Sequence, residues 1–161
     1  MLRLVTVEEV KDNWENYKID LISASEATEG GGILTEGGSE EYLKGIYSRL
    51  MNPFNQCMHL WIENEDEYLL LTHIQTCEFT KRKTLVLFSL TRTKDVDKET
   101  VSQFYFDAYP VISEFAKKNK CLGIFGYSDL EYFARIAKQV EEAINQKIIT
   151  RYQFYLPLTN N

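Results

Sequence analysis

Thr84-Leu-Val-Leu-Phe-Ser-Leu-Thr-Arg92 has the length and apolar composition of a buried β-strand. A second apolar segment, Cys121-Leu-Gly-Ile-Phe-Gly-Tyr127, follows after a helical pattern over residues 100–119. Apolar residues recur along that pattern at helical spacing and form a wide stripe on one face. Two strands joined by a helix of this length form a crossover unit, so we expect both strands to be parallel in one sheet.

The segments before this unit predict two helices and an antiparallel meander. Thr6 and Glu9 form a capping box that opens the first helix, and Ser39 caps the second. A glycine-rich loop lies between the two helices. Three strands joined by charged turns follow, at residues 56–63, 68–79 and 84–92. A final helix from Ser128 and a strand over residues 148–158 end the pattern, so we expect a single α/β (α+β) domain over residues 1–161 with a mixed sheet and helices on both faces.

Composition and charge limit the classes of partner. The chain has 161 residues, 44% of them hydrophobic, and a net charge of −6. This charge predicts no nucleic acid as the main partner, although a local basic patch stays open. No apolar run approaches the roughly 18 residues of a membrane span, so we expect no membrane partner. Three cysteines at no regular spacing predict reduced, buried thiols and a cytoplasmic location.

The order of predicted elements resembles the GCN5-related N-acetyltransferase fold over nearly the whole chain. The passage Phe115-Ala-Lys-Lys-Asn-Lys-Cys-Leu-Gly-Ile-Phe-Gly-Tyr127 is similar to the segment that joins the central helix to the next strand in that family, with Asn119-Lys120 where the family usually has glycine. The chain also resembles small bacteriophage-encoded members of this fold, some of which are virion components. The resemblance therefore implies either an acyltransferase or a diverged relative.

The loop that binds the acetyl-CoA pyrophosphate in this family does not match. The resemblance places it at residues 92–100, where Asp95 and Asp97 stand at the positions of the family's glycines. No glycine occurs from Thr84 to Asn119, so the backbone cannot approach phosphates as closely as the family's loop does. We expect no cofactor on this ground. If acetyl-CoA does bind, the residues expected to contact it are Arg92, Lys94, Val101, Ser102 and Gln103.

Candidate catalytic residues are weak. The resemblance implies a carboxylate base near the central strands and a tyrosine acid on the last helix. Glu78 and Tyr132 stand nearest to these positions, and each is more simply explained as a surface or packing residue.

A zinc site is a further candidate that we considered and do not favour. If the first hairpin turns at Glu65, Cys57 lies opposite His73, with His59 and Cys77 on the same face. Their spacing is not a common zinc pattern, so we expect no metal and a half-buried face instead.

Two functions stay open, with a different α/β binding module as a third. The first is a non-catalytic, diverged acetyltransferase-like protein that acts through protein–protein contact, in an oligomer, an assembly or a phage virion. Tyr105, Tyr109 and Tyr155 would anchor its protein partner. The second is an acyl-CoA-dependent N-acyltransferase with an atypical cofactor loop.

Overall fold

The computed structural model describes residues 1–28, 38–52, 57–63, 68–92, 98–126 and 141–142. The chain forms two compact units, residues 1–127 and 128–161. Of the second unit only Glu141 and Glu142 are described, and both are helical. The predicted final helix and strand therefore lie almost wholly outside the described residues, and the prediction of one domain stays a prediction.

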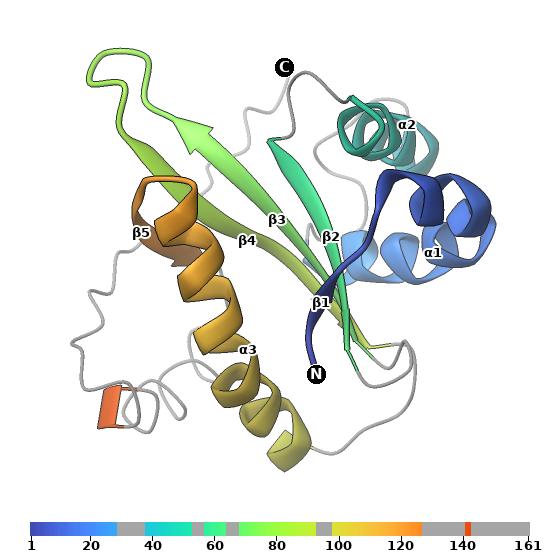
Figure 1. The fold of residues 1–161 in the computed structure, drawn as a ribbon. Coiled ribbons are helices and arrows are strands. Elements are labelled where there is room, and N and C mark those ends of the chain that lie inside the picture. Colours follow the sequence, from blue (N-terminus) through green and yellow to red (C-terminus); the bar gives the residue numbers. More distant parts are fainter. Residues whose placement is uncertain (29–37, 53–56, 64–67, 93–97, 127–140, 143–161) are drawn as a thin grey trace, which may run out of the picture. The chain divides into compact units, whose positions relative to one another are not determined.

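The first unit is a five-stranded sheet with helices on both faces (Figure 1). Its strands lie in the order β1-β2-β3-β4-β5, which is also their order along the chain. The elements are β1 (Arg3–Leu4), α1 (Val7–Thr28), α2 (Gly38–Leu50), β2 (Met58–Glu63), β3 (Tyr68–Thr76), β4 (Lys83–Arg92), α3 (Lys98–Lys118) and β5 (Cys121–Gly126).

Strand pairing confirms the predicted meander and crossover. β1 to β4 pair antiparallel with their neighbours, whereas β4 and β5 are parallel and joined by α3. Two boundaries differ from prediction. α3 begins at Lys98 instead of Thr100, and β3 ends at Thr76 instead of Phe79.

The predicted capping box opens α1. The Thr6 backbone N–H donates to Glu9 Oε2 at 2.9 Å, and the Glu9 N–H donates to Thr6 Oγ1 at 3.2 Å. These bonds satisfy two N–H groups that a helix start leaves unpaired. The hydrogen bond from the Thr6 backbone is the main reason why the pKa of Glu9 is lowered.

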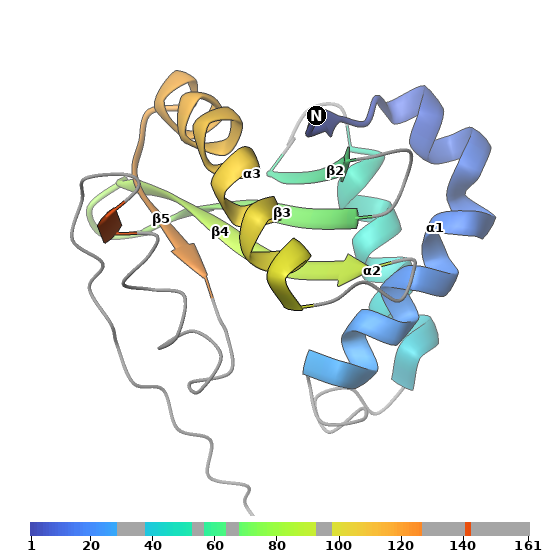
Figure 2. The ribbon, with the colours of Figure 1, turned by 90° about the horizontal axis from the view of Figure 1, so that it is seen from below.

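Two apolar cores lie on opposite faces of the sheet (Figure 2). The first lies under α1 and α2 and contains the inward residues of β2, among them Leu60 and Ile62. The second lies under α3 and contains Trp61 of β2 together with Phe104 and Ile112 of α3. This alternation along β2 is the one that the sequence predicts for a strand covered on both faces.

Aromatic and polar contacts fix α3 on its face of the sheet. The Phe115 ring packs edge-on against Trp61 and His59, with ring centroids 4.8 Å apart in each pair. The Trp61 indole N–H donates to the Thr72 hydroxyl at 2.9 Å, so the polar atom of this buried tryptophan is satisfied.

No helix within the described part of the chain is long and apolar enough to cross a membrane.

Candidate functional site

β4 is paired with β5, the parallel strand at one edge of the described sheet, over only part of the length of β4. β4 and β5 pair from Lys83–Cys121 to Leu87–Gly126, and within the described residues the pairing ends there. β4 continues to Arg92 and stays paired with β3 throughout. Along residues 88–92, the alternate backbone N–H and C=O groups on the β5 side of β4 therefore have no described strand opposite them.

A β-bulge lies at the point where this pairing ends. Leu71 of β3 is opposite Ser89 of β4, whereas the next residue, Thr72, is opposite Leu87, so Phe88 is the extra residue. A bulge bends the strand and increases its twist. The bend therefore falls next to the last described pair of β4 and β5. The Phe88 ring stacks with Tyr42 of α2 at a centroid distance of 6.3 Å.

The bulge also turns two hydroxyl groups toward α1 and α2. Ser89 and Thr91 are opposite Leu71 and Leu69, which both belong to the core under those helices. Both side chains are buried, and neither Ser89 Oγ nor Thr91 Oγ1 has a hydrogen-bond partner among the described residues. A buried hydroxyl that makes no hydrogen bond lowers the stability of the fold.

The start of α3 lies beside the end of β4. Arg92 is opposite Tyr68, the first residue of β3, and the Tyr68 ring stacks on Phe104 of α3 at 4.7 Å. This contact holds the first turns of α3 next to the end of β4. In a helix that begins at Lys98, the N–H groups of the first turn have no partner within the helix. The edge of β4 that faces no described strand and the positive end of a helix dipole are thus neighbours, an arrangement suited to an extended ligand with an anionic group.

The structure gathers only some of the predicted cofactor residues. Arg92 is the last residue of β4. Because α3 begins at Lys98, earlier than predicted, Val101 lies in its first turn and Ser102 and Gln103 follow that turn. Lys94 lies outside the described residues, and the cofactor assignments stay predictions.

Neither candidate catalytic residue is placed by the structure at the end of β4 beside α3. Glu78 is exposed in the turn between β3 and β4, at the opposite end of β4 from Arg92. Tyr132 lies outside the described residues. Three tyrosines were predicted to anchor a partner. Tyr109 is half-buried on α3, whereas Tyr155 and the side chain of Tyr105 are not among the parts of the chain that the structure describes.

The arrangement considered for zinc is wrong by one residue of register. His73 is opposite Met58 rather than Cys57, so His73 faces α1 and α2 whereas His59 packs under α3 against Phe115. Cys77 lies in an exposed turn beyond the end of β3. No group of three metal-binding side chains occurs among the residues that the structure describes.

The cysteines and histidines have distinct environments. All three cysteines are free thiols, as expected, but Cys77 is exposed and not buried. Hydrogen bonds from the Thr80 side chain, and from the backbone at Thr80 and Phe79, lower the pKa of the Cys77 thiol. The pKa of His59 is lowered to about 4, first by burial and second by the charge of the nearby His73. The His59 imidazole is therefore neutral near pH 7.

Several solved structures with a similar fold are acetyltransferases. A probable acetyltransferase superposes with a TM-score of 0.64 over 100% of this chain and 99% of its own, at 10% identity. A possible acetyltransferase from Clostridium difficile 630 gives 0.62 over 99% and 98%, at 14% identity. An aminoglycoside N-acetyltransferase in complex with CoA gives 0.58 over 98% and 93%, at 12% identity. The chain has the GCN5-related N-acetyltransferase fold.

At this level of identity the likeness shows the fold alone. No protein-family model matches the sequence, and no curated protein is similar to it in sequence. The acetyltransferase fold was thus predictable from the order of elements, as the sequence resemblance implied. The similarity to phage-encoded members stays a prediction.

The bulge and its hydroxyls were missed by the sequence interpretation. Residues 84–88 are apolar on both faces apart from Thr84, which hides the alternation. One signal was present. Apolar residues at 85 and 87 give way to polar residues at 89 and 91, so the alternation changes face within the strand. In the structure Leu85, Leu87 and Leu90 all pack toward α3. Ser89 and Thr91 therefore share the opposite face, where a regular strand would have put Phe88 and Leu90.

Proposed function

We propose that this protein binds an acyl-coenzyme A along the unpaired edge of β4 and transfers the acyl group to an amine. The observation that carries the proposal is that β4 runs on to Arg92 after its pairing with β5 ends, beside the first turn of α3. The solved structure of similar fold with bound CoA supports the choice of ligand class.

The proposed reaction is the transfer of an acyl group from a thioester to an amine. The amine nitrogen attacks the thioester carbonyl, the new C–N bond forms, and the C–S bond breaks to release the thiol of CoA. The proton lost by the amine ends on that thiol, directly or through water. Backbone N–H groups on the open edge of β4 would stabilise the negative charge that develops on the carbonyl oxygen when the amine attacks the carbonyl carbon. The N–H groups of the first α3 turn would face a phosphate.

The test is calorimetric titration of acetyl-CoA at low ionic strength, with variants at the last paired residue of β5. Gly126 is opposite Leu87, and an added Cβ would meet Leu87 atoms at 3.7 Å, an ordinary contact. Gly126→Ala should therefore bind like the wild type, whereas Gly126→Trp would block the edge. Gly123→Trp is the matched control, because an added Cβ at Gly123 meets nothing within 4 Å.

We expect a Kd on the order of tens of micromolar or lower for the wild type, Gly126→Ala and Gly123→Trp. For Gly126→Trp we expect at least about a tenfold loss. Absence of heat from the wild type at millimolar ligand contradicts the proposal. Equal affinity of Gly126→Trp and the wild type would place the ligand elsewhere.

A second candidate is favoured by the sequence of the loop between β4 and α3. Asp95, Asp97 and the absence of glycine disfavour phosphate binding there. A diverged protein that no longer catalyses and instead acts through protein contact would fit this loop. A wild-type protein that binds no acyl-CoA, yet melts cooperatively, is the result expected of that candidate. A place in a phage virion rests on the sequence resemblance and stays a prediction.

A further inference from the structure

The opposite end of β4 carries a cluster of positive charge. We call it the basic end, and it consists of Lys81, Arg82, Lys83, Lys117, Lys118 and Lys120. All six side chains are exposed. Within the same two segments, residues 77–83 and 114–122, the carboxylates are Glu78 and Glu114, and Glu114 is paired with Lys118 at 2.8 Å. The net charge of −6 therefore hides a strong segregation of charge.

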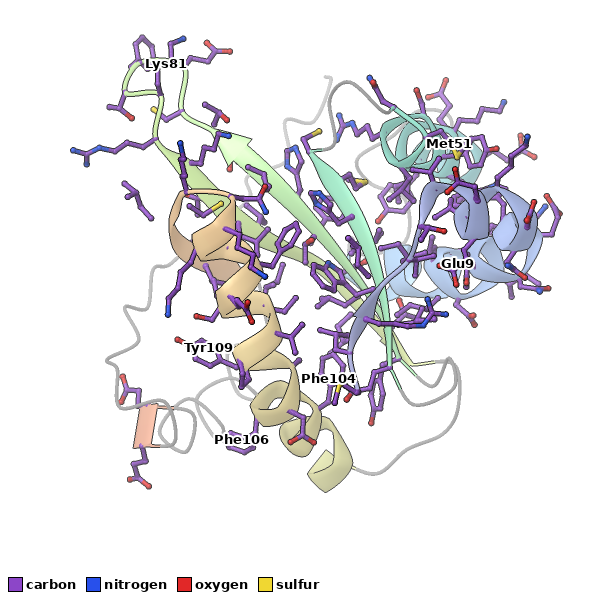
Figure 3. The ribbon with its side chains drawn as sticks, viewed as in Figure 1. Glu9, Met51, Lys81, Phe104, Phe106 and Tyr109 are labelled. Carbon is purple, nitrogen blue, oxygen red and sulfur yellow. The ribbon has the colours of Figure 1, made fainter. Side chains whose placement is uncertain are left out.

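Strand pairing makes these six cations one continuous row. Lys83 at the start of β4 is opposite Cys121, which directly follows Lys120. The Lys120 N–H donates to the Lys117 carbonyl at 2.9 Å, so Lys120 stays on the last turn of α3. Lys81 lies at the apex of the β3–β4 hairpin (Figure 3). The row thus runs from the hairpin apex, along the start of β4, to the end of α3.

The hairpin apex is internally bonded and presents an aromatic side chain. The Cys77 N–H donates to the Arg82 carbonyl at 2.9 Å, and the Lys81 N–H donates to the Cys77 carbonyl at 2.8 Å. Phe79, between these residues, is 95% exposed, and Leu122, next to the other half of the row, is 71% exposed. An almost fully exposed phenylalanine among cations gains nothing from the fold itself. It is available to a partner.

Two lysines of the basic end also adopt a backbone conformation that disfavours side chains. Lys81 and Lys120 have φ angles of 57° and 59°, and they are the two non-glycine residues with positive φ in the described chain. Glycine would be less strained at both positions. Their charge is thus retained at a cost in stability.

We propose that the basic end binds single-stranded nucleic acid, with phosphates along the row of cations and a base stacked on Phe79. A row of cations with an exposed aromatic ring follows the pattern of sequence-tolerant single-strand binding. The β3–β4 hairpin extends past the end of α3 (Figure 1), so the cations follow a line rather than a flat surface, which favours a linear polyanion over a membrane. The surface is at the far end of β4 from Arg92, so this inference does not depend on acyl-CoA binding.

The test is fluorescence anisotropy of labelled oligouridylate and oligothymidylate, titrated with the whole chain at low ionic strength. The same protein is sedimented with vesicles of phosphatidylcholine and phosphatidylglycerol, and is titrated with unlabelled polyphosphate as a competitor. The two oligonucleotides distinguish RNA from DNA as the source of the shared chemistry. We expect saturable binding, with affinity that falls steeply as salt is raised.

Single substitutions separate stacking from charge. Phe79→Ala should weaken binding by about fivefold to a hundredfold, the range of a lost base–aromatic stack. Arg82→Gln should make the slope of log K against log salt shallower by about 0.7, the value for one single-strand phosphate contact. The matched controls lie on the helices of the other face. Ile19→Ala removes another exposed apolar side chain and Lys44→Gln another exposed cation, and both should bind like the wild type.

Three outcomes would overturn the proposal. The first is no anisotropy change for either oligonucleotide at low ionic strength. The second is equal affinity of wild type and Phe79→Ala with full displacement by polyphosphate, which would leave only unspecific charge attraction. The third is sedimentation with vesicles without oligonucleotide binding, which would make a membrane the partner. Since the substituted side chains are exposed, unchanged melting temperatures should accompany all four variants.

Discussion

The two ends of β4 differ in almost every respect. At its start, residues 83–87 are paired on both sides, and they continue into a hairpin that carries cations and an exposed ring. At its end, residues 88–92 have β3 on one side and no described strand on the other. They hold two buried hydroxyls that have no hydrogen-bond partner among the described residues. The two ends of this one apolar strand therefore differ in their pairing. Residues 83–87 lie between β3 and β5, whereas residues 88–92, which begin at the bulge, are paired with β3 alone among the described strands.

The largest expected difference between the two ends is in stability. Leu85 at the closed end is 0% exposed, so Leu85→Ala should lower the free energy of unfolding by about 3 kcal/mol. Ser89→Ala at the open end removes a buried hydroxyl without a partner, so it should lie within about 1 kcal/mol of the wild type or be more stable. Urea unfolding measures both. A Ser89→Ala variant as damaged as Leu85→Ala would mean that the hydroxyl is satisfied and the open end is not special.

The packing of α3 on the sheet should depend on acid. His59 has a pKa of about 4 when folded and an ordinary value near 6.5. Because the unfolded chain binds the proton more readily, stability is complete above pH 6.5 and is lost as the pH falls toward 4. The loss should reach roughly 2–3 kcal/mol.

Urea unfolding of the wild type and of His59→Phe across this pH range measures the effect. The phenylalanine variant keeps a ring against Phe115 but cannot titrate, so its curve should be flatter between pH 6.5 and 4. Parallel curves for the two proteins would show that His59 is hydrated in the folded state.

The sequence predicted the fold well because its strongest signals were local. The capping box at Thr6 and Glu9 and the long amphipathic stripe of α3 depend on neighbouring residues, and both appear in the structure. The register of the first hairpin was wrong by one residue. Glu63 is opposite Tyr68, whereas the predicted register would have placed it opposite Glu67. A shift of one residue moves His73 to the other face of the sheet.

The candidate site was harder to predict because it arises from pairing between distant segments. The end of β4–β5 pairing depends on where Gly126 lies relative to Leu87, which no local pattern records. The bulge at Phe88 was hidden by apolar residues on both faces of the strand. The basic end was equally hidden, because its cations come from a hairpin and a helix end far apart in the sequence.

A smaller effect is expected from the two aspartates of the loop that follows β4. If acyl-CoA binds there, the carboxylates of Asp95 and Asp97 weaken its phosphate contacts. Replacing both by Asn should tighten the Kd for acetyl-CoA by about fivefold, the effect of roughly 1 kcal/mol expected for screened surface charges. Asp12→Asn on α1 is the control for a change in total charge. A double variant with unchanged affinity would separate the phosphates from this loop.

The smallest expected effect is at the closed end. Lys120 lies in the turn after α3 and has a φ of 59°, a conformation that costs stability for a residue with a Cβ. Lys120→Gly should raise the free energy of unfolding by about 0.5–1 kcal/mol, whereas Lys120→Ala, which keeps the Cβ, should not. Thermal melting of the two variants decides the matter. Equal melting temperatures would mean that the strain is relieved in solution.

Amide hydrogen exchange along β4, with and without acetyl-CoA, tests the difference between its two ends most directly. Without ligand, amides of residues 84–87 should exchange slowly, and those amides of residues 88–92 that face away from β3 should exchange faster. With acetyl-CoA, protection should appear at residues 88–92 and in the first turn of α3, with little change at the hairpin. Uniform protection along β4 without ligand, or no change at residues 88–92 with it, would contradict the account.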